Sequence, residues 1–156
     1  MAALACINDV LLRIVLPKQF DGFWLFMMNE IITIMRAQAQ LTPAFTDHLL
    51  TAVSTFVSKH LPRIETTANA AVQSFLEVFY AFTFAQTDAD RFRGCVEVWV
   101  LFCEHLNIEG GSTGNYKHTM YPLYEKGLLF TAVKMVDKLS FASNHQVEFC
   151  HDARRC

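Results

Sequence analysis

Residues 87–107 read TDADRFRGCVEVWVLFCEHLN, and this stretch indicates how the rest of the chain folds. Its apolar residues recur every three or four positions, which is typical of one face of an amphipathic helix. The stripe comprises Phe92, Cys95, Val96, Trp99, Phe102, Cys103 and Leu106. We expect Thr87 to cap the first turn, where Asp88 and Asp90 lie at the positive end of the helix dipole. A helix with such a large aromatic face must bury it against other helices.

A strand is the alternative for part of this stretch. Residues 96–100 alternate in polarity and contain three valines, a composition that suits a β-strand. The helical period nevertheless continues for about four turns around them, so the pattern favours the helix. We predict that Trp99 lies in the core between adjacent helix pairs.

Composition limits the classes of protein to consider. The 156 residues suit one domain, and 53% hydrophobic against 18% charged residues argues against disorder. A net charge of −2, with scattered lysines and arginines, predicts no nucleic-acid binding. The longest runs without a formal charge, such as 66–76, have 11 residues, whereas a membrane span needs roughly 18 to 20. We find no signal-peptide pattern, and the five cysteines suit a reducing compartment, the cytosol or the nucleus.

The same period appears in five further segments, so the chain is predicted to be all-α. The expected helices cover residues 2–15, 20–40, 43–61, 67–84, 87–107 and 121–141. Thr42 and Pro43 form a start signal for the third helix, and Pro17 and Pro62 stop helices. Residues 107–115 contain three glycines and are expected to form a loop. In the last helix, Tyr124, Leu128, Thr131, Met135 and Leu139 share one face.

Short connections between these helices predict about three antiparallel helix pairs. A weak internal echo relates Phe56, His60 and Leu61 to Phe102, His105 and Leu106, and its histidines are 45 residues apart. That period suits a HEAT-like α-solenoid, an α-α superhelix of the armadillo type, over residues 1–141, followed by a poorly defined tail, 142–156. A compact six-helix bundle is the alternative.

The solenoid hypothesis has a consequence for the ends of the array. Terminal repeats need polar outer faces, yet we expect Leu4, Ile7 and Leu11 to face outward from the first helix. The sequence is therefore interpreted as an interior piece of a longer array.

The search for chemistry gives no catalytic, cofactor-binding or metal-binding candidate, and we expect no enzyme activity. The six histidines show no zinc spacing, and Cys150, His151 and Cys156 are too few ligands in an unpatterned tail. His60 and His105 are expected at helix ends, where imidazole can satisfy terminal carbonyls. The glycines of 110–114 lack the lysine of a phosphate-binding loop, and Phe82, Phe84 and Trp99 are interpreted as core residues, not as a ligand pocket.

Several core-type motifs nevertheless resemble those of a known family, the karyopherin exportins of the importin-β superfamily. These motifs are SKHLPRIE (58–65), Phe75 with Leu76, FTFAQ (82–86) and CVEVWVLFCEHL (95–106), and Cys6, Ile7, Asn8, Tyr124, Glu125, Leu128 and Phe141 match in the same order. The resemblance extends over nearly the whole chain up to Phe141.

The resemblance implies a HEAT-repeat segment of a nuclear export receptor. It implies binding of Ran in its GTP state, protein cargo and nuclear pore proteins, with shuttling between nucleus and cytoplasm. The most similar members imply that the cargo is actin bound to profilin. No cofactor and no membrane insertion are implied, and no Ran-contacting or cargo-contacting residue can be transferred. A helical-repeat scaffold for protein interactions, without a transport role, is the alternative function.

Overall fold

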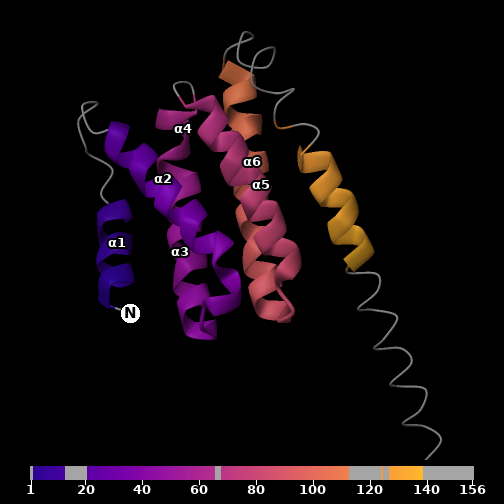
Figure 1. Cartoon of the computed structure of the whole chain (residues 1–156). Coiled ribbons are helices and arrows are strands. Elements are labelled where there is room, and N and C mark those ends of the chain that lie inside the picture. The colour runs from indigo at the N-terminus through magenta and orange to yellow at the C-terminus, as the bar shows by residue number, and fades with distance from the viewer. Residues whose placement is uncertain (1, 13–20, 66–67, 113–123, 125–126, 139–156) are drawn as a thin grey trace, which may run out of the picture.

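The computed structural model describes residues 2–12, 21–65, 68–112, 124 and 127–138 (Figure 1). All secondary structure in these residues is helical, which confirms the all-α prediction and rejects the strand at 96–100. The predicted tail, 142–156, lies outside the described residues. The helices are α1 (Ala2–Leu12), α2 (Asp21–Arg36), the 3-10 helix η2 (Gln38–Gln40), α3 (Pro43–Lys59), α4 (Leu61–Ile64), α5 (Asn69–Ala85) and α6 (Ala89–Ser112), followed by a helix over residues 127–138.

The helices form two layers. In one layer α3 lies between α1 and α6, and in the other α2 packs against α5. The 127–138 helix continues the second layer, because Phe130 stacks on Tyr80 of α5 with ring centroids 5.5 Å apart. Figure 1 shows successive long helices running in opposite directions, with α1 and the 127–138 helix at opposite ends.

This arrangement is three antiparallel pairs in a row: α1 with α2, α3 with α5, and α6 with the 127–138 helix. Each layer is built from contacts between neighbouring pairs, as in a solenoid. A closed bundle would bring the first and last helices together. The predicted HEAT-like solenoid is therefore confirmed. The echo around His60 and His105 falls on α3 and α6, the equivalent helices of adjacent pairs.

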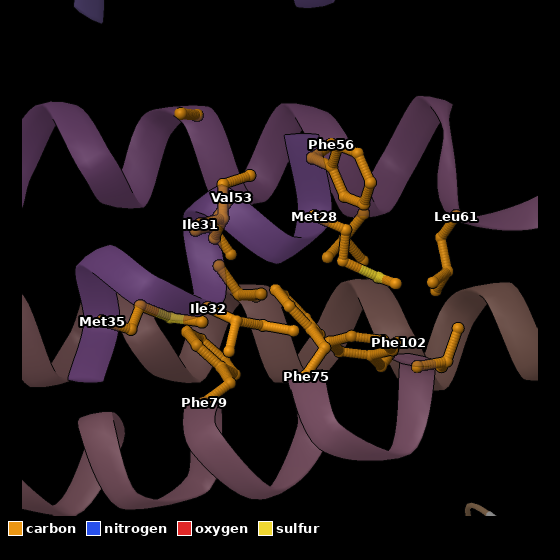
Figure 2. Close-up of a cluster of buried hydrophobic side chains, with 14 of the residues drawn as sticks. Met28, Ile31, Ile32, Met35, Val53, Phe56, Leu61, Phe75, Phe79 and Phe102 are labelled. Carbon is orange, nitrogen blue, oxygen red and sulfur yellow. The ribbon is translucent and has the colours of Figure 1, made fainter. Parts of the chain in front are cut away.

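The core lies between the layers. In Figure 2, Met28, Ile32 and Met35 of α2 meet Phe75 and Phe79 of α5, with Phe102 of α6 beside them. All six side chains are buried. We call this set of apolar contacts between the two layers the seam. Burying side chains of this size contributes about 1.5–3 kcal/mol each, so the seam is the main stabilising contact of the array.

Helix starts follow from local chemistry. Thr42 caps α3, since its Oγ1 accepts from the backbone N–H of Phe45 at 3.3 Å, and Pro43 occupies the first turn, as predicted. The predicted cap of α6 was wrong by one residue. Asp88, not Thr87, accepts from the N–H of Arg91, at 3.0 Å. A carboxylate is the stronger acceptor for this exposed amide, because it also interacts with the helix dipole.

Helix boundaries differ from the predictions at several positions. The helix predicted at 20–40 ends at Arg36 and is followed by η2, and the helix predicted at 43–61 ends at Lys59, with Pro62 in the first turn of α4. The loop predicted from residue 107 was also wrong, because α6 continues through Gly110 and Gly111 to Ser112. Each glycine costs only about 1 kcal/mol relative to alanine, which is too little to stop a helix that is already formed.

The outward orientation predicted for the first helix was also wrong in part. Leu11 is fully buried and Ile7 is half-buried against the core, because α3 covers this face of α1. The side chain of Leu4 lies outside the described residues. Among the larger apolar side chains of α1 whose burial the structure describes, Val10 and Leu12 are exposed.

Gly94 marks a close approach between α3 and α6. A Cβ atom built at this position would lie 3.2 Å from Cδ1 of Leu50, while one at Gly22 would meet no atom within 4 Å. We therefore expect Gly94→Leu to lower the free energy of unfolding by about 1–3 kcal/mol through overpacking. Urea unfolding followed by circular dichroism measures this change. Gly22→Leu is the matched control, and equal stability of the two variants would contradict the close approach.

Candidate functional site

Trp99 occupies the junction between the second and third helix pairs. It is 5% exposed, and its indole packs against Phe79 and Phe102 with centroid distances of 5.2 and 5.7 Å. Its Nε1–H donates to Oγ1 of Thr83 at 3.0 Å, and that hydroxyl donates to the carbonyl of Phe79 at 2.8 Å. The prediction that Trp99 is a core residue between adjacent pairs is confirmed.

Two hollows flank the 127–138 helix, and Trp99 contributes to both. One, of about 320 Å³, lies against α5 and is lined in part by Glu77, Tyr80, Tyr124 and Phe130. The other, of about 450 Å³, lies against α6 and is lined in part by Val96, Val100, Cys103, Leu128 and Met135. The last helix therefore rests on the array along a narrow contact, with mainly apolar grooves on either side.

Lys138 fastens this helix to the second pair. Its Nζ donates to the carbonyl of Gln86 at 2.6 Å and to that of Phe84 at 3.4 Å, and it lies 4.4 Å from the centroid of the Phe92 ring. The ammonium group thus satisfies carbonyls at the C-terminal end of α5. Burial lowers the pKa of Lys138. No pattern in the sequence singled out Lys138, because the carbonyls that it binds are 52 and 54 residues away.

A buried carboxylate makes a second polar link between the pairs. Glu65 is 2% exposed, and its Oε2 accepts from Nε2 of His105 at 3.0 Å and from the hydroxyl of Tyr124 at 3.2 Å. His105 was predicted to satisfy carbonyls at a helix end, and this prediction was wrong because α6 continues beyond it. The imidazole instead satisfies a carboxylate that could not remain buried without hydrogen bonds.

His60 does satisfy a terminal carbonyl, but one from a different helix. Its Nε2 lies 2.6 Å from the carbonyl oxygen of Leu11, in the last turn of α1. The prediction that His60 satisfies a terminal carbonyl is thus confirmed. The carbonyl belongs to Leu11, which lies 49 residues away in the sequence.

Apolar side chains are exposed at both ends of the second layer. On α2, Phe26 is 56% exposed and Phe23 is partly exposed. On the last helix, Leu129 is 66% exposed and Val133 and Val136 are also exposed, at the i, i+4, i+7 spacing of a helix-packing stripe. These faces have the composition of surfaces that other helices cover.

Within the described ranges, no group of three or more histidine, cysteine, aspartate or glutamate residues is arranged to hold a metal ion. Cys150, His151 and Cys156 lie outside those ranges. Of the helices that the structure describes, none has the length and apolarity needed to cross a membrane.

Sequence comparisons agree with this architecture. The chain is 25% identical over 154 residues to exportin-6 of Dictyostelium discoideum, and the match covers 92% of the chain. It is 24% identical over 155 residues to exportin-6 of mouse and of human, with 91% of the chain covered. The chain is similar to exportin-6. The resemblance to exportins inferred from the motifs is thereby confirmed.

The exportin-6 relatives are much longer than this chain. The chain spans 14% of the length of each of these three proteins. No protein-family model matches the chain, and no solved structure is significantly similar to it.

Trp99 provides a test of the junction between the second and third pairs. Trp99→Ala removes a buried ring and is expected to lower the free energy of unfolding by about 3–5 kcal/mol, whereas Trp99→Phe keeps part of the packing and should cost less. Chemical denaturation of the two variants measures the difference. A loss below 1 kcal/mol for Trp99→Ala would contradict the buried position.

Cysteine reactivity tests the burial of α6. Cys95 is buried, and burial raises the pKa of its thiol to about 12. Cys6 and Cys103 are exposed, but the atoms packed around the Cys103 thiol desolvate it in part and raise its pKa. Of these three thiols, iodoacetamide at pH 8 should therefore alkylate Cys6 first, Cys103 more slowly and Cys95 only after unfolding. Peptide mass spectrometry reads out each site, with the urea-unfolded chain as control. Rapid alkylation of Cys95 in the folded chain would show that the junction is open.

Proposed function

We propose that this chain is a segment of a Ran-GTP-dependent nuclear export receptor that carries protein cargo from nucleus to cytoplasm. The observation that supports the proposal best is the similarity to exportin-6 over more than nine-tenths of the chain. By the same resemblance, the proposed cargo is profilin-bound actin, and nuclear pore proteins are further partners. Residues 1–141 would form the repeat segment.

The architecture is suited to this role. An export receptor works through extended surfaces, and a two-layer solenoid exposes the side of each helix that its neighbours do not cover. Ran and cargo would each favour the same curvature of the array, so that binding of one raises the affinity for the other. Release of both would follow GTP hydrolysis in the cytoplasm.

Curvature depends on how adjacent helix pairs contact each other, and the third pair offers a place for such a change. The 127–138 helix has a groove on either side and is held to the second pair by the Lys138 link, while Tyr124, which precedes it in the chain, donates to Glu65. The angle of this helix can therefore change by a small rolling motion while the seam between the layers stays packed. Motions of this type are the shear movements of packed helices.

A pull-down with the complete gene product tests the proposal. The bait is Ran locked in its GTP state, offered with and without profilin–actin, and Ran in its GDP state is the matched control. We expect retention to rise at least about fivefold when Ran-GTP and profilin–actin are both present, which corresponds to the lower range of allosteric coupling.

Two results would overturn the export role. Binding that is the same with GTP-bound and GDP-bound Ran would favour the alternative function, a helical-repeat scaffold without transport activity. Equal retention of Ran-GTP with and without cargo protein would show that the two partners do not raise each other's affinity, and export depends on that coupling. Binding of Ran-GTP with a cargo other than profilin–actin would retain the export role and replace the cargo.

A further inference from the structure

The imidazole of His60 lies where α1, α2 and α3 meet. His60 follows the last residue of α3 and is 1% exposed. Its Nε2 is 2.6 Å from the carbonyl oxygen of Leu11 in α1, and its ring stacks on Trp24 of α2 at a centroid distance of 3.6 Å and an interplanar angle of 15°. One side chain thus links the first helix pair to the second.

The contacts fix which nitrogen carries hydrogen in the neutral ring. A carbonyl oxygen only accepts hydrogen bonds, so Nε2 must be the protonated nitrogen and Nδ1 has a bare lone pair. Nδ1 is buried and has no hydrogen-bond partner within the described part of the chain. A second proton there would create a buried charged donor without an acceptor, which is energetically unfavourable.

The charges around the ring also favour its neutral form. Lys59 of α3 and Arg63 of α4 both repel a positive imidazolium. On α2, the Asp21 carboxylate is bound by Arg63 at 2.7 Å, and on α1, Asp9 is exposed to solvent. Burial therefore lowers the pKa of His60, and the two cationic neighbours add to this effect, while the Leu11 hydrogen bond opposes it.

We propose that His60 is an acid-sensitive latch that holds α1 on the array and releases it when the ring is protonated. Its neutral form fits the buried contact with Leu11 and Trp24. In the released state the imidazole is solvated and regains its ordinary pKa of about 6.5. The released state binds the proton more tightly than the held state. The contribution of His60 to holding α1 is therefore fully present above pH 6.5 and is lost progressively as the pH falls below that value.

Hydrogen exchange of the intact 156-residue chain tests the latch. Between pH 7.5 and 5, after correction for intrinsic exchange rates, the opening constant of the α1 amides should rise by up to about tenfold per pH unit below 6.5. His60→Gln should abolish this rise, because the glutamine amide can donate to the Leu11 carbonyl but does not titrate. His48→Gln, an exposed position on the same helix, is the matched control and should behave like the wild type.

Tryptophan fluorescence gives an independent readout that does not require the glutamine variant to fold. In a Trp99→Phe background only Trp24 emits, and its emission changes when the ring of His60 leaves the indole face on which it stacks. A change in this emission with a midpoint below pH 6.5, together with acid-dependent opening of α1, supports the latch. A midpoint at or above 6.5, or opening of α1 that has the same pH dependence in His60→Gln, would overturn it.

Discussion

The apolar seam between the two layers is the contact on which the rest of the structure depends. Side chains from α2 and α5 meet there, and aromatic residues of α3 and α6 close it from the opposite layer (Figure 2). Because each helix buries one face in this seam, the opposite faces remain free for grooves and binding surfaces. The first and second pairs meet through the α1–α3 and α2–α5 contacts, and α3 and α6 make the corresponding contact between the second and third pairs.

The polar contacts between helix pairs orient the pairs and contribute less to stability than the seam does. The links made by His60, Glu65 and Lys138 each join one helix pair to the next across a long sequence separation. A hydrogen bond contributes only about 0.5–1.5 kcal/mol net, so these links add little to the total stability. Their directionality instead defines how adjacent pairs are oriented. In the proposed export role, that orientation would set the curvature of the array.

The helical class, the helix-pair architecture and the burial of Trp99 could all be predicted, because each depends on a periodic pattern that many residues share. Single boundaries were less predictable. The end of α6 was misplaced, since each glycine costs only about 1 kcal/mol and a helix that is already formed continues through two of them. Cys103 was assigned to the apolar stripe of α6 but is exposed, because the 127–138 helix leaves a groove beside it.

The sequence by itself determined which residues form helices, which face of each helix is apolar and where Thr42 begins a new one, because these properties arise from a repeat of 3.6 residues per turn and from hydrogen bonds within one turn. The tertiary structure alone decided that His60 meets Leu11, 49 residues away, and that Tyr124 meets Glu65, 59 residues away. Such pairings depend on the packing angle and spacing of helices, to which every buried side chain contributes. No local pattern encodes them.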